Sequence, residues 1–127
     1  MTQIHPLVRA WTWLFAALFA LSALVQLNDP DWLPWFAFYV AATLVAGAAP
    51  VWVQARRAAL LIGLVALIWA VGIAAPGLEP ITLHELTTDL RMKTLNVERW
   101  REIGGLAIVV AWSLGVVPGL AGRPLAP

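Results

Sequence analysis

The chain has 127 residues, of which 61% are hydrophobic and only 12% are charged, with a mean hydropathy of +0.82 and a formal net charge of +1. A soluble domain of this length exposes too much surface to hide so much apolar side chain, so the composition excludes a water-soluble globular protein and indicates an integral membrane protein. The absence of cysteine excludes disulfides, thiolate catalysis and cysteine-based metal sites.

The first apolar run covers residues 8–27 and contains only isolated polar residues. At about 1.5 Å per residue, such a helix crosses a hydrocarbon core of about 30 Å, so we expect the first transmembrane helix here. The alternative is a signal peptide, with Arg9 as its charged region and a cleavage site near Ala23. Trp11 and Trp13 crowd its start and no good small-x-small site precedes the following turn, which favours the transmembrane helix.

A tight acidic turn at residues 26–35 separates the first apolar run from the second. The ring of Pro30 disfavours a helical backbone at Asp29, so the first helix must end near Asn28. Asp29 and Pro30 suit the first two positions of a type I turn. Asp31 then stands where its carboxylate can cap the next helix. The first two helices are therefore expected to form an antiparallel hairpin.

The second and third helices are expected at residues 32–53 and 58–75. Pro50 and the Arg56-Arg57 pair end the second helix, and Pro76-Gly77 closes the third. Small residues recur along the third helix at a spacing that lets helices approach closely in lipid, and we interpret them as packing faces. These residues are Ala59, Gly63, Ala66, Ala70 and Ala74.

The polar stretch at residues 76–96 is expected to form an outer loop. Thr82 can cap a short helix in this loop, with Leu83, Leu86 and Leu90 on one face, and such a helix would lie along the membrane surface. A fourth transmembrane helix follows at residues 97–117. The predicted fold is all-α: one membrane domain over the whole chain, built as an up-down four-helix bundle with an interfacial amphipathic helix between the third and fourth helices. Residues 119–127 are expected to be a short loose tail.

Four crossings place the N-terminus, the turn around Arg56 and the C-terminal tail on one side of the membrane. That side carries four arginines and no acidic residue, whereas the other side carries all seven acidic residues and four basic ones. The two sides carry equal numbers of basic residues, so this count does not decide the orientation. The short loops decide it, because the turn with Arg56-Arg57 is basic, whereas the acidic turn on the other side has no positive charge. We predict an integral protein of the bacterial inner (cytoplasmic) membrane with both termini in the cytoplasm.

The run Gln26-Leu27-Asn28-Asp29-Pro30-Asp31, followed by Trp35 and Tyr39, resembles the signature of the transmembrane protein 220 family. That family comprises small four-helix membrane proteins of bacteria and eukaryotes. The similarity extends to Trp69 and to Arg101-Glu102-Ile103-Gly104-Gly105 and covers nearly the whole chain, although the polar loop has no counterpart. The resemblance implies the four-helix topology. It implies no particular biochemical activity, because none is established for the family.

A cluster of mostly polar and aromatic residues from two distant parts of the chain is expected at the same outer membrane level. They are Gln26, Asn28, Asp29, Pro30, Asp31, Trp35 and Tyr39 from the first hairpin, and Glu98, Arg101 and Glu102 from the head of the fourth helix. The guanidinium of Arg101 could pair with Asp29, Asp31 or Glu102. We interpret the cluster first as helix ends that fasten two hairpins together.

The functional alternative treats Glu102, about one turn inside the fourth helix, as an ionisable group on a proton or ion path. No other acidic residue or histidine lies deeper in a predicted helix, so a proton path across the membrane would lack a second ionisable group. A membrane enzyme with an acidic and histidine-containing outer site is a further alternative, from His84, Glu85, Asp89, Asp29 and Asp31.

We predict no catalytic residue, metal ligand or cofactor, because neither a nucleophile–base pair nor a complete ligand set is visible. Basic nucleic-acid patches are absent as well. The favoured hypothesis is an accessory or scaffold subunit in the lipid bilayer, packed against a larger membrane complex or its own copies. A component of a small-solute or proton transporter or channel, using the outer carboxylates, is the second hypothesis.

Overall fold

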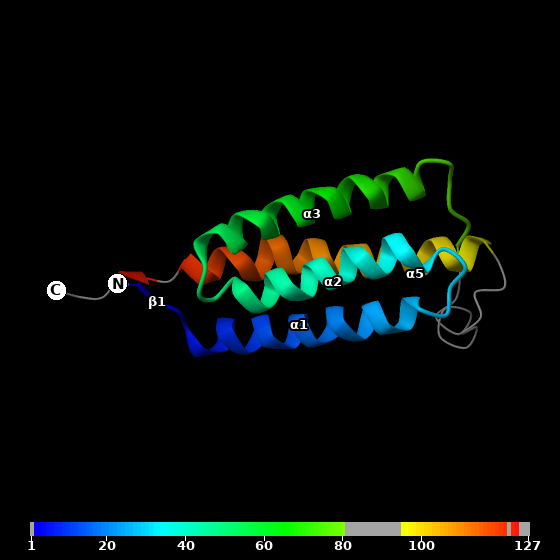
Figure 1. Ribbon diagram of the computed structural model, residues 1–127. Coiled ribbons are helices and arrows are strands. Elements are labelled where there is room, and N and C mark those ends of the chain that lie inside the picture. Colours follow the sequence, from blue (N-terminus) through cyan, green and yellow to red (C-terminus); the bar gives the residue numbers. More distant parts are fainter. Residues whose placement is uncertain (1, 81–94, 122, 125–127) are drawn as a thin grey trace.

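The computed structural model describes residues 2–80, 95–121 and 123–124. Within them the chain forms a bundle of four antiparallel helices (Figure 1), which confirms the predicted all-α bundle. The helices are α1 (Pro6–Gln26), α2 (Trp32–Ala48), α3 (Val53–Ala74) and α5 (Leu95–Ala111), which continues into the π-helical turn η1 (Trp112–Val116) and the 3-10 turn η2 (Val117–Ala121). The predicted interfacial helix lies outside the described residues.

The two ends of the bundle differ in charge. The α1–α2 turn and the start of α5 lie at one end, and both termini lie at the other with the α2–α3 turn (Figure 1). We call the first the acidic end, because it holds every acidic residue that the structure describes: Asp29, Asp31, Glu79, Glu98 and Glu102. The second is the basic end, with Arg9, Arg56 and Arg57.

The first helix ends close to the position that Pro30 predicts, but the predicted cap of the second helix is not formed. α1 ends at Gln26, and the backbone N–H of Asp29 donates to the Gln26 carbonyl at 2.9 Å, just before Pro30. Asp31 occupies the N-cap position of α2, but its side chain makes no capping hydrogen bond, so the predicted cap is wrong. Its φ of −104° and ψ of 37° depart from the extended backbone that normally aims a capping side chain at the first turn.

The boundary between α2 and α3 differs from the prediction. α2 ends at Ala48 rather than at residue 53, and α3 begins at Val53 rather than at residue 58. Arg56 lies in the first turn of α3 and donates from Nε to the Ala49 carbonyl at 2.9 Å and from Nη2 to the Pro50 carbonyl at 3.3 Å. These carbonyls follow the end of α2 and lack helical partners, so the arginine satisfies them.

The fourth helix packs on α3 through small residues. Ala59, Gly63 and Ala66 are buried, as predicted for this face, whereas Ala70 is half-buried. The Ser113 hydroxyl, in η1, donates to the Ala59 carbonyl at 2.9 Å, and a methyl group added at Gly63 would overlap the Ser113 side chain. Close backbone approach of this kind favours helix association in lipid.

Within the predicted loose tail, residues 119–121 are helical and residues 123–124 form a short strand. η2 extends the fourth helix to Ala121, because the fully buried Leu120 packs with Ala49 and Ala55 at the basic end. Two-residue strands then pair antiparallel, with β1 (Thr2–Gln3) against β2 (Arg123–Pro124). The pairing holds the two ends of the chain together (Figure 1).

In the part of the chain that the structure describes, three helical segments are long and apolar enough to cross a membrane: Pro6–Gln26, Val53–Ala74 and Val97–Leu120. α2 is a shorter apolar helix of 17 residues. At about 1.5 Å per residue it is about 26 Å long, which lies at the lower limit for a membrane span. α2 nevertheless runs between the same two ends of the bundle as its neighbours (Figure 1).

Candidate functional site

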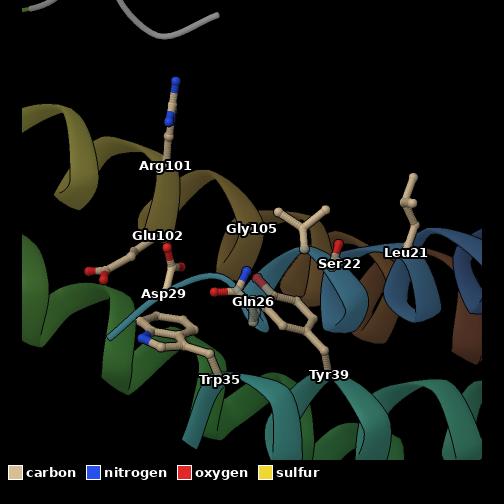
Figure 2. A pocket seen from close by; sticks show the side chains of 10 residues that line it. Leu21, Ser22, Gln26, Asp29, Trp35, Tyr39, Arg101, Glu102 and Gly105 are labelled. Atoms are coloured by element: carbon tan, nitrogen blue, oxygen red, sulfur yellow. The ribbon is translucent and has the colours of Figure 1, made fainter. Parts of the chain in front are cut away.

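A cavity of about 280 Å³ lies at the acidic end, between α1, α2 and α5 (Figure 2). It forms because α1 packs mainly along α2, and α3 mainly along α5, while α1 meets the fourth helix through η1 and η2 at the other end. The lining comprises Leu21, Ser22, Val25 and Gln26 of α1, Asp29 of the turn, Trp35 and Tyr39 of α2, and Arg101, Glu102 and Gly105 of α5.

Tyr39 brings α2 against α5. Its side chain is only 3% exposed, and a methyl group at Gly105 would overlap its hydroxyl. Among the described residues this hydroxyl has no hydrogen-bond partner, although its side chain reaches the cavity (Figure 2). A polar atom on a buried side chain usually bonds to protein or water. Tyr39 therefore presents an unused hydrogen-bonding group to the cavity.

Trp35 forms a rigid wall of the cavity. It is 4% exposed, and its ring stacks on Trp69 with centroids 4.2 Å apart and an interplanar angle of 19°. Phe38 meets Trp69 edge-on, at 5.5 Å and 83°. Offset-stacked and edge-to-face pairs are the favourable arrangements of aromatic rings. Because the cluster fixes the orientation of Trp35, its ring lines the cavity in a defined position, near Asp29 (Figure 2).

Carboxylates dominate the charge around the cavity. Asp29 and Glu102 line it, and one carboxylate oxygen each from Asp31, Glu98 and Glu102 lie within 4.8 Å of one another. Burial raises the pKa of Asp29 above its usual value, as does the neighbouring Asp31, while the positive charge of Arg101 lowers this pKa in part. Among the described residues, five carboxylates stand against two arginines, Arg99 and Arg101, at the acidic end, so its formal net charge is negative.

The Arg101 side chain lines the cavity and extends away from Asp29 and Glu102 (Figure 2). The predicted pairing of its guanidinium with a carboxylate stays a prediction. The head of α5 is also held by Trp100, whose indole Nε1 donates to the Glu79 carbonyl at 2.7 Å. This bond ties the segment after α3 to α5.

The structure groups most of the predicted polar cluster in one place. Gln26, Asp29, Trp35, Tyr39, Arg101 and Glu102 line the cavity, and Asp31 and Glu98 lie next to Glu102. Asn28 and Pro30 shape the turn and do not line the cavity. Sequence reasoning missed Leu21, Ser22, Val25 and Gly105 as lining residues, although Ser22 precedes Gln26 by four residues and Gly105 follows Glu102 by three, which places each pair on one helix face.

The three clustered carboxylates do not by themselves define a metal centre. Among the described residues, Asp31, Glu98 and Glu102 are the group close enough to share a cation, but Asp31 is exposed and solvated carboxylates often gather without a metal. His5 lies at the basic end, where its Nδ1 accepts from the Leu7 backbone N–H at 3.1 Å and caps α1. His84, Glu85 and Asp89 lie outside the described residues.

Below the cavity the bundle is closed by apolar side chains. Phe19, Leu106 and Trp112 are fully buried, and the Phe19 and Trp112 rings meet edge-to-face at 5.2 Å. The buried hydroxyls between the cavity and the basic end are hydrogen-bonded. Thr12 donates to the Val8 carbonyl at 2.9 Å, and Ser113 donates to the Ala59 carbonyl of α3. The Trp112 indole nitrogen is buried without a partner among the described residues.

Fold and cavity together define a small polytopic α-helical membrane protein with a polar pocket at one end. The family model described as Transmembrane family 220, helix, matches residues 18–117, which include the acidic turn, α2, α3 and the head of α5. The chain belongs to this family, as its resemblance to the signature predicted. No solved structure matches the chain.

Proposed function

We propose that the protein is a non-catalytic accessory subunit that packs through its lipid-facing helices against a larger membrane complex or a second copy of itself. An apolar groove of about 260 Å³ between α1 and α2 supports this proposal. Its lining is Ala20, Ala23, Leu24, Phe36, Val40, Thr43 and Leu44, and it exposes no polar surface. The Thr43 hydroxyl is already bonded to the Tyr39 carbonyl at 2.8 Å.

The groove suits a transmembrane helix of a partner. Lipid tails are as apolar as leucine, so helices associate in a membrane by close packing rather than by escape from water. Ala20 and Ala23 supply small side chains, and Leu24, Phe36 and Leu44 supply larger ones around them. A ridge of side chains from another helix can enter such a groove.

We further propose that α2 completes a set of four spans, with both termini in the cytoplasm of a bacterial cell. The basic end carries Arg9, Arg56 and Arg57. Positively charged segments next to membrane spans tend to stay on the cytoplasmic side. The acidic end would then face outward.

Photo-crosslinking in native membranes tests the accessory role. A benzophenone side chain at Leu44, inside the groove, is expected to give a discrete protein adduct, whereas the same group at Leu64, exposed on α3, is the matched control. An adduct of twice the chain mass of 13.8 kDa identifies a second copy, and any other mass identifies a different subunit. Lipid adducts alone at both positions would contradict the proposal.

A transporter or channel component is the second candidate. Glu102 lies within the apolar segment Val97–Leu120 and lines the cavity, and carboxylates in membrane-spanning segments often mark ion or proton paths. The apolar layer of Phe19, Leu106 and Trp112 below the cavity counts against a continuous path. Purified protein in vesicles is expected not to dissipate a proton gradient. Dissipation that Glu102→Gln abolishes while leaving the protein folded would favour transport over the accessory role.

A further inference from the structure

We propose that the cavity at the acidic end binds an organic ammonium group, held between the carboxylates of Asp29 and Glu102 and the aromatic rings of Trp35 and Tyr39. The proposal is independent of the accessory role, because it concerns the cavity and not the groove between α1 and α2. It assigns a ligand class to a pocket that the packing of the bundle leaves open.

The charge of the lining selects a cation. Asp29 and Glu102 line the cavity, and Asp31 and Glu98 add two further carboxylates beside Glu102. The cationic side chain among the lining residues, that of Arg101, extends away from Asp29 and Glu102 (Figure 2). A ligand cation would replace water next to the carboxylates, in a partly enclosed place where Coulomb attraction is stronger than in bulk solvent.

The aromatic wall selects an organic cation. Trp35 lines the cavity, and its stack on Trp69 holds the ring in a fixed orientation. An ammonium group over the face of a tryptophan or tyrosine is attracted by the ring quadrupole, and quaternary ammonium ligands are the usual guests of such sites. The Tyr39 hydroxyl, without a partner among the described residues, is free to bond a polar atom of the ligand.

Size and opening agree with this ligand class. A single buried water needs about 10–15 Å³ of accessible volume, so a cavity of about 280 Å³ is far larger than a site for one bare ion. Leu21 and Val25 line the cavity and are also 59% and 54% exposed on the outside of α1. The cavity thus opens sideways toward lipid, and its ligand can carry an apolar chain. The ammonium group can come from a free amine or from a lipid headgroup.

Thermal unfolding in an uncharged maltoside detergent tests the proposal with choline as the probe. Choline is expected to raise Tm in a saturable manner, and its uncharged isostere 3,3-dimethylbutan-1-ol is expected not to. Glu102→Gln and Trp35→Leu are each expected to weaken choline binding about tenfold or more. Trp13→Leu, a change at an exposed tryptophan far from the cavity, is the control that should bind as the parent does.

Trp35→Phe keeps an aromatic ring, so intermediate binding is expected from it even if Trp35→Leu does not fold. Nanodiscs identify the source of the ammonium group: weaker choline binding in phosphatidylcholine than in phosphatidylglycerol indicates a lipid headgroup, and equal binding indicates a free amine. Equal Tm shifts from choline and its isostere, or none from either, would overturn the proposal. A shift by Mg²⁺ alone that Asp31→Asn abolishes would overturn it in favour of a metal site.

Discussion

Substitution of Gly105 by alanine tests the contact that shapes the cavity. A methyl group at this position would overlap the Tyr39 hydroxyl, whereas a methyl group at the adjacent Gly104 meets no atom within 4 Å. Overpacking of a tight contact typically costs about 1–3 kcal/mol. Alanine in a helix interior is favoured over glycine by about 1 kcal/mol, a gain that is common to both positions. We therefore expect Gly105→Ala to be less stable than Gly104→Ala by about 1–3 kcal/mol.

The second substitution in this test is Tyr39→Phe, which removes the atom that the new methyl group would meet. Since the hydroxyl has no hydrogen-bond partner among the described residues, the single variant should lose little stability. The double variant Gly105→Ala/Tyr39→Phe should recover most of the loss, which makes the two changes non-additive. Unfolding in mixed micelles, followed by circular dichroism, measures all four proteins. Equal stability of the two alanine variants, or additive losses, would refute the reasoning.

Other substitutions test the remaining contacts. Gly63→Ala should lower the free energy of unfolding by about 1–3 kcal/mol, because the methyl group would overlap Ser113, and unchanged micelle unfolding would contradict the α3 packing. Arg56→Ala should cost about 1–3 kcal/mol by leaving two carbonyls without their donor, while Arg57→Ala, at an exposed position, should stay within about 0.5 kcal/mol. The folded state raises the pKa of Asp29 and so holds a proton that the unfolded chain releases. Stability should therefore fall as pH rises from the usual aspartate pKa through the raised one, and Asp29→Asn should flatten this part of the pH profile.

The parts of the fold that local chemistry dictates were predictable from the sequence. Pro30 restricts the residue before it, so the end of α1 could be placed within about two residues. Because successive helices run in opposite directions, the sequence also predicted that the acidic turn and Glu102 lie at the same end of the bundle. In the structure, Asp29 of this turn and Glu102 line the same cavity. The small residues Ala59 and Gly63 indicated a packing face because their size alone permits a close approach in lipid.

The remaining features depend on contacts between helices that no local pattern encodes. Arg56 donates to two carbonyls in the turn between α2 and α3, whereas its sequence context indicated only a charged turn. The approach of Tyr39 to Gly105 depends on the register between α2 and α5, which hydropathy leaves open. The cavity itself follows from the way α1 joins the fourth helix through η1 and η2. The sequence therefore indicated which residues gather, but not how they enclose a space.

Cysteine labelling in whole cells tests the central claim most directly, because the chain has no native cysteine. Single variants Pro30→Cys, in the α1–α2 turn, and Pro76→Cys, after α3, sample the acidic end, and Gln54→Cys, at the start of α3, samples the basic end. The expected result is that an impermeant thiol reagent modifies the first two from outside and the third only after the membrane is opened. Modification of Pro30→Cys and Pro76→Cys from opposite sides of the membrane would contradict the bundle and the cavity together.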